Sequence, residues 1–160
     1  LKGCLNPILQ EAINYVNAPG LAKARNIEVK EIKTKEPANF ANQITVRLVT
    51  DKGEHSVSGT LFGKAEARIV MIDGYRVDVQ PGGWLLTCPH VNRPGIIGKV
   101  GTMLGEEGVN ISSMQVGLTE IEGTSIMVLG VDSDVPNAVL LKLKGIDGIY
   151  DAKLINFDAR

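Results

Sequence analysis

The chain has 160 residues, enough for one large domain or for two small ones of roughly 70–100 residues each. Its formal net charge of −1 lacks the basic excess of a nucleic-acid-binding protein and gives no attraction to anionic membranes. No apolar run approaches the roughly 18 residues that cross a membrane, and no signal peptide follows Leu1. We therefore expect a cytoplasmic piece cut from the interior of a longer protein, with no nucleic-acid or membrane partner.

The two cysteines, Cys4 and Cys88, lie far apart in the sequence, and neither belongs to a CxxC pair. Because metal-ligand spacing is absent from the sequence, no metal site is predicted. We expect both cysteines to be small buried hydrophobic residues in a reducing cytoplasm.

The first predicted elements are helical. Apolar residues recur at helical spacing over residues 5–17 and predict a helix there. A second, short helix is expected over residues 18–26, because its Ala-Pro start places proline in the first turn, where it is tolerated. Apolar and charged residues then alternate over residues 27–33, which predicts an edge strand, and the polar residues 34–39 predict a loop.

Four short strands follow in close succession. They are predicted at residues 43–49, 55–62, 68–72 and 75–79, with turns at 51–54, 63–66 and 73–74. Residues 1–80 are therefore predicted to form a helix-backed antiparallel sheet domain.

A Pro-Gly-Gly sequence at residues 81–83 marks a domain boundary, and the pattern changes after it. In the second domain, residues 84–160, strands are predicted at 84–88, 109–116, 125–131 and 150–157, with helices at 94–107 and 136–144. The order β-α-β-β-α-β is that of the ferredoxin-like fold, with two helices on one face of an antiparallel sheet. The fold class is therefore α+β, and the other sheet face and the outer strands are expected to be available for pairing.

The polar loop that leads into the first helix of the second domain is the richest candidate site. Free N–H groups near Gly95 and Ile96, together with the helix dipole, favour an anion such as the carboxylate of a small metabolite. His90 and Asn92 add directed donors and acceptors. Asn110 begins the next strand, toward the opposite end of the fold, so a second copy of the chain would be needed to bring it to the same ligand.

A purely structural interpretation of this loop stays open. Asn92 and Arg93 could cap the helix, a backbone carbonyl could satisfy His90, and Asn110 could be a turn residue.

A second candidate site lies in the first domain. Arg68 and Arg76 flank the Asp-Gly turn at residues 73–74, so a hairpin could bring them together. Two guanidinium groups would favour a phosphorylated anion, which the planar fork of arginine binds through parallel charge-assisted bonds. The alternative is that both are solvated charges on strand faces.

Three motifs of the second domain resemble an ACT domain, and they are closest to the ACT domain of D-3-phosphoglycerate dehydrogenase: HxNRPG at 90–95, GKVG at 98–101 and GVNI at 108–111. Upstream sequences are similar to the allosteric substrate-binding domain that precedes ACT in the longer form of that enzyme: NYVNAP at 14–19, GTLFG at 59–63 and RIVxIDGYRVD at 68–78. The resemblance covers nearly the whole chain, and the two-domain combination is more specific than either motif set alone.

The resemblance implies a regulatory region whose catalytic domains, absent here, would oxidise 3-phosphoglycerate with NAD in the first step of L-serine synthesis. No cofactor is implied for the region itself. L-Serine would bind between the ACT domains of two subunits, with His90, Asn92 and Asn110 at serine-contacting positions. Arg68 matches a basic position for an anionic effector, whereas Gln80 stands where some relatives carry another basic residue.

Two other interpretations stay open. The regulatory region of an L-serine dehydratase resembles the same domain pair, and a stand-alone amino-acid-binding module would share the ACT motifs. None of these interpretations makes the region itself a catalyst, because the sequence has no dinucleotide-binding, P-loop, GxSxG or HExxH motif.

Overall fold

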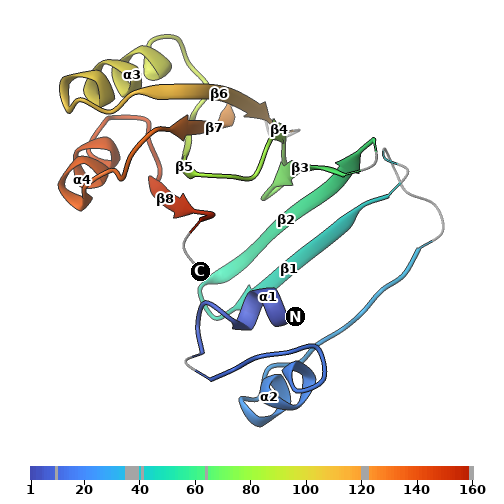
Figure 1. The fold of residues 1–160 in the computed structure, drawn as a ribbon. Helices are drawn as coiled ribbons and strands as arrows, with labels where there is room; N and C mark the ends of the chain where they lie inside the picture. The colour runs from blue at the N-terminus through green and yellow to red at the C-terminus, as the bar shows by residue number, and fades with distance from the viewer. Residues whose placement is uncertain (10, 35–39, 41, 64, 120–122, 159–160) are drawn as a thin grey trace. The chain divides into compact units, whose positions relative to one another are not determined.

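The computed structural model describes residues 1–9, 11–34, 40, 42–63, 65–119 and 123–158. The chain forms two compact units, residues 1–38 and residues 39–159 (Figure 1). The predicted boundary at residues 81–83 therefore lies inside the second unit, between two strands of one sheet. None of the described helices is long and apolar enough to cross a membrane.

The first unit contains two short helices, α1 (Lys2–Leu5) and α2 (Ala18–Ala24). Helix α2 carries proline in its first turn and ends before Asn26, whose φ of +56° is left-handed, so its prediction is confirmed. A small apolar cluster holds the unit together: its buried members are Leu5, Ile13, Ala18 and Ala22. Cys4 is exposed, so the prediction that it is buried is wrong.

The long helix predicted over residues 5–17 is wrong, because α1 ends at Leu5 and the described residues between 6 and 17 are not helical. Asn14 Oδ1 accepts hydrogen bonds from the N–H groups of Val16 and Asn17 at 2.8 and 2.9 Å. Such local bonds compete with the helical backbone ladder. The edge strand predicted over residues 27–33 is also wrong, since the structure gives this exposed segment no strand partner among the described residues. Most of the loop predicted after it lies outside the described residues.

The strands of the second unit form one antiparallel sheet in the order β1-β2-β3-β4-β6-β7-β5-β8. Their bounds are β1 Ile44–Thr50, β2 Gly53–Phe62, β3 Glu66–Ile72, β4 Tyr75–Val79, β5 Trp84–Val91, β6 Ile111–Leu118, β7 Thr124–Val131 and β8 Lys153–Asn156. Each strand predicted after residue 42 is present, with its ends shifted by a few residues. The Asp73-Gly74 turn has φ of +47° and +83°, as a type I′ hairpin turn requires.

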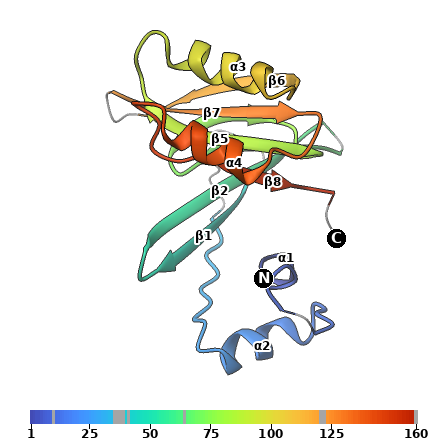
Figure 2. The ribbon, with the colours of Figure 1, turned by 90° about the vertical axis from the view of Figure 1, so that its left-hand side faces the viewer.

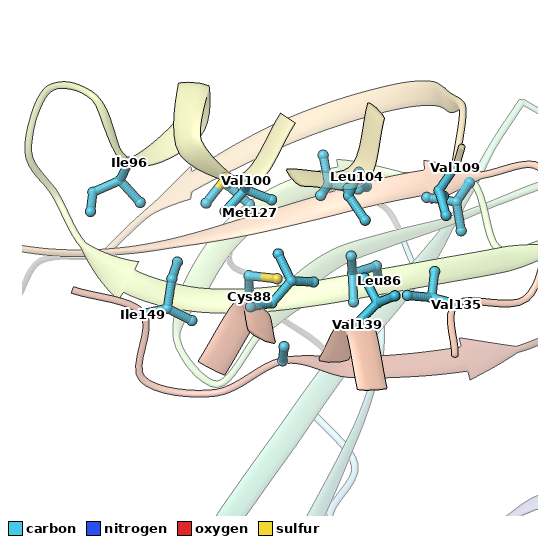
Figure 3. Packing of buried hydrophobic residues seen from close by; sticks show 14 residues of the cluster. Leu86, Cys88, Ile96, Val100, Leu104, Val109, Met127, Val135, Val139 and Ile149 are labelled. Atoms are coloured by element: carbon cyan, nitrogen blue, oxygen red, sulfur yellow. The ribbon is translucent and has the colours of Figure 1, made fainter. Parts of the chain in front are cut away.

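Strands β6-β7-β5-β8 and the helices α3 (Ile96–Glu106) and α4 (Asn137–Lys144) form the ferredoxin-like unit, so the predicted α+β class is confirmed (Figure 2). Its core lies between the sheet and both helices, and Figure 3 shows this packing. The side chains buried most completely there include Leu86, Cys88, Val100, Leu104, Met127, Leu129 and Leu143. Burial raises the pKa of the Cys88 thiol to about 12, so the thiol stays neutral and packs as a small apolar group.

The face of this sheet that turns away from the helices is not wholly available for pairing, contrary to the prediction. Leu85, Ile126 and Val128 point to that face and cluster with Val79 and with partly buried side chains of β3 and β4. Strand β4 also pairs with the last residue of β6, where Arg76 lies opposite Leu118. The hairpin β3–β4 therefore covers part of the second face.

Gly117 of β6 is the residue that permits this junction, since β4 crosses directly over it. We expect Gly117→Ala to lower the free energy of unfolding by about 1–3 kcal/mol, because the new Cβ would lie 2.6 Å from Arg76 O and 2.7 Å from Val77 Cγ1. Chemical denaturation followed by circular dichroism measures the change.

The matched control is Gly101→Ala in α3, where nothing lies within 4 Å of the new Cβ. That variant is expected to be neutral or more stable, because alanine favours a helix over glycine by about 1 kcal/mol. Equal stability of the two variants would contradict the proposed role of Gly117.

Candidate functional site

The loop from β5 to α3 leaves the helix start uncapped. Strand β5 runs to Val91, three residues beyond its predicted end, and α3 begins after Gly95, whose φ is +90°. In the part of the chain that the structure describes, no side chain makes a capping hydrogen bond to the start of this helix, so the capping interpretation of Asn92 and Arg93 is wrong. The first N–H groups of a helix have no intrahelical partner, and the dipole adds positive potential there. The geometry thus favours binding of an anion, such as a small carboxylate, beside Ile96.

His90 lies at the end of β5 with only 2% of its surface exposed. Its Nδ1 lies 2.8 Å from the carbonyl oxygen of Val91, which can only accept, so Nδ1 carries the proton. The other nitrogen, Nε2, is buried and has no hydrogen-bond partner among the described residues. The backbone carbonyl therefore satisfies only one of the two nitrogens, and Nε2 is an unused acceptor in the neutral ring.

Asn92 and Asn110 lie at opposite ends of β7. The N–H of Asn92 donates to Gly123 O at 2.8 Å, just before β7 begins. The carbonyl of Asn110 accepts from Asp132 N at 3.3 Å, just after β7 ends. Because a strand rises about 3.3 Å per residue, the length of β7 separates the two asparagines by about 20 Å or more. Both side chains are exposed, and one chain does not bring them together.

The turn between α4 and β8 packs against the β5–α3 loop. The sequence did not indicate that this turn belongs to the candidate site. Arg93 Nη2 donates to the backbone oxygen of Asp147 at 3.0 Å and pairs with its carboxylate. The N–H of Val91 donates to Gly148 O at 2.8 Å. The hydrogen bond and the charge of Arg93 lower the pKa of Asp147. The Asp-Gly pair signals a turn, but its long-range partner cannot be read from the sequence.

The two arginines of the first predicted domain have different surroundings, and Arg76 pairs with Met71 in the β3–β4 register. The guanidinium of Arg68 pairs with Glu66 and lies 3.4 Å from Asp78, and the hydrogen bond to Glu66 raises the pKa of Arg68. Arg76 is exposed at the junction of β4 and β6, and Gln80 is exposed after β4. A phosphate at Arg68 would have to compete with two carboxylates, so the anion site stays a prediction.

His55 pairs with a carboxylate that lies 18 residues away in the sequence. Its Nδ1 lies 2.8 Å from a carboxylate oxygen of Asp73, whose other oxygen accepts from Ser56 N at 2.6 Å. The carboxylate thereby ties the β3–β4 turn to β2. In the described part of the chain, no group of three His, Cys, Asp or Glu side chains is placed to hold a metal ion.

Comparison with known proteins places both halves of the chain in families. Residues 1–73 match the D-3-phosphoglycerate dehydrogenase intervening domain, and residues 84–148 match the ACT domain. The chain is 44% identical over 156 residues to the D-3-phosphoglycerate dehydrogenase of Methanocaldococcus jannaschii, and the match covers 98% of the present chain. It is 39% identical to the Synechocystis enzyme over 152 residues, or 95% of the present chain. It is 35% identical to the Bacillus subtilis enzyme over 156 residues, or 98% of the present chain.

The chain spans only 29%, 27% and 30% of the length of these three relatives. The matched part is the pair of domains rather than a whole dehydrogenase. The uncapped start of α3 and the buried His90 both fall within the ACT match. This chain therefore belongs to the D-3-phosphoglycerate dehydrogenase family, as a regulatory region made of an intervening domain followed by an ACT domain.

Proposed function

We propose that this region senses L-serine and thereby regulates a cytoplasmic D-3-phosphoglycerate dehydrogenase. In that enzyme, catalytic domains beyond the present sequence would oxidise 3-phosphoglycerate with NAD, the first step of serine synthesis. Residues 1–80 would form the intervening domain and residues 84–160 the ACT domain that carries the serine site. The names of the relatives support the parent activity, and the β5–α3 loop supports the ligand class.

The unpaired Nε2 of His90 is the observation that carries this proposal. A buried polar group without a partner costs about 1–3 kcal/mol, so a ligand that supplies the missing donor gains that energy. The hydroxyl of serine is such a donor. The serine carboxylate would accept from N–H groups beside Gly95 and Ile96, and the oxygen of the Asn92 side chain would accept from the ammonium.

A second copy of the chain would complete the site. Asn110 lies too far from Asn92 to contact the same small molecule within one chain, so the partner's copy of this asparagine would supply the second contact to the ammonium. One edge of β6 pairs with β7. On the other edge, the pair between Leu118 and Arg76 of β4 is the only strand pairing in the described residues. An edge with free backbone groups favours pairing with a further strand, which supports self-association through the ACT domain.

We expect Asn92→Ala and Asn110→Ala each to weaken serine binding roughly tenfold or more. A hydrogen bond to a charged group contributes about 1.5–3 kcal/mol, and 1.4 kcal/mol corresponds to a factor of ten. Isothermal titration calorimetry measures the affinity, and sedimentation velocity with and without serine measures dimer formation, which ligand binding should strengthen.

The control is Asn6→Ala, an exposed asparagine of the first unit, which should leave the affinity unchanged. A monomer that binds serine equally well in both variants would show that the site is not shared. A dimer that binds no serine would contradict the sensing function itself.

The region itself is expected to bind no NAD, because no dinucleotide motif follows any of its strands. Titration of the chain with NAD should give only heats of dilution. A saturable isotherm would place a nucleotide site in the regulatory region and overturn this expectation.

For the proposed anionic-effector site, we expect Arg68→Ala and Arg76→Ala to weaken binding of phosphate or 3-phosphoglycerate. Glu66→Gln should strengthen it, because it removes one of the carboxylates that pair with Arg68. Affinity measured by calorimetry at low ionic strength tests both directions. Unchanged binding in both arginine variants would mean that these are solvated surface charges.

A further inference from the structure

Two cations lie at the start of α3, and one carboxylate faces them. Arg93 precedes the helix, and Lys99 lies in its first turns, where its backbone N–H bonds to Gly95 O at 3.1 Å. The hydrogen bond from Arg93 and the charges of Arg93 and Lys99 lower the pKa of Asp147. The carboxylate cancels one of the two positive charges beside the uncapped helix start.

Asp147 engages Nη2 of Arg93, one of the nitrogens of the fork through which arginine binds a phosphate. Arg93 Nη2 is directed at both the backbone oxygen and the side-chain carboxylate of this one residue. Arginine binds phosphate through the same parallel N–H groups, so a guanidinium engaged in this way offers fewer donors to a ligand. A second negative charge on a ligand would also be repelled by the carboxylate.

The turn that carries Asp147 is fixed by its backbone and not by this ion pair. Gly148 adopts a φ of +95°, and its oxygen accepts from Val91 N. An added Cβ at Gly148 would lie 2.9 Å from Ile96 Cδ1, which shows how closely the turn packs on the helix start. Ile149 also forms a β-bridge with His90. The carboxylate is therefore held beside the first turn of α3, and its replacement leaves the backbone contacts in place.

We propose that Asp147 is a specificity-determining residue that restricts this site to ligands with a single carboxylate, such as a neutral zwitterionic amino acid. By holding Arg93, it disfavours amino acids that carry a further acidic group, such as phosphorylated or dicarboxylic ones. The inference rests on the proposed serine site and adds the charge class of its ligand. The Arg93–Asp147 pair is solvated, with 43% and 85% of the side chains exposed, so the effect is moderate.

The experiment compares L-serine, L-aspartate and O-phospho-L-serine by calorimetry on the whole chain. Asp147→Asn should strengthen binding of the two acidic ligands, L-aspartate and O-phospho-L-serine, by about three- to tenfold, while serine affinity changes by less than about twofold. The gain should decrease at high ionic strength and disappear in the double variant Arg93→Ala, Asp147→Asn. Asp51→Asn, in the exposed β1–β2 turn, makes the same change in net charge elsewhere and should have no effect.

Inorganic phosphate provides a test that does not require serine binding. In nuclear magnetic resonance titrations, phosphate should shift the amide signals of Ile96 and Ile97 at lower concentration in Asp147→Asn than in wild type. Equal phosphate and O-phospho-L-serine affinities in the two proteins would overturn the role of Asp147. A wild-type chain that binds no serine would instead contradict the proposed function, and the phosphate titration would still decide the charge role.

Discussion

The burial of β7 on both of its faces is the constraint on which the rest of the second unit depends. Met127 and Leu129 pack toward α3 and α4, while Ile126 and Val128 pack toward the β3–β4 hairpin. A strand buried on both faces fixes its register strongly, since a slip of one residue would exchange the two sets of side chains. Both layers of the unit, and both ends where Asn92 and Asn110 lie, are positioned by this one strand.

The candidate site follows from how the chain leaves β5. The strand continues past Cys88 to Val91, which carries His90 into the interior and orients one ring nitrogen toward a backbone carbonyl. The chain then enters α3 through Gly95 without a side-chain cap. A protein that used these residues only for stability would be expected to cap the helix and to satisfy both ring nitrogens. The unmet donors and acceptor are instead what a small zwitterion could use.

Much of the second unit could be predicted because its strands are alternating or continuous apolar runs and its turns carry glycine at the required positions. The first unit was predicted less well, because the periodicity of apolar residues does not show which polar side chains bond to the backbone. Asn14 and Asn17 bond to nearby backbone groups, so an apolar pattern with helical spacing did not become a long helix. Likewise, the alternating segment at residues 27–33 has no strand partner among the residues that the structure describes, and a strand exists only when another strand pairs with it.

By itself, the sequence determined the α+β class, the order of the elements from residue 43 onward and the candidate residues His90, Asn92 and Asn110. These follow from local signals, because side-chain periodicity, turn chemistry and motif spacing are encoded within a few residues. Only the tertiary structure decided that the β3–β4 hairpin packs on the ferredoxin-like sheet, that Nε2 of His90 is left unpaired, and that Asp147 holds Arg93. Arg93 and Asp147 are 54 residues apart, and such contacts depend on how separate elements pack rather than on any local pattern.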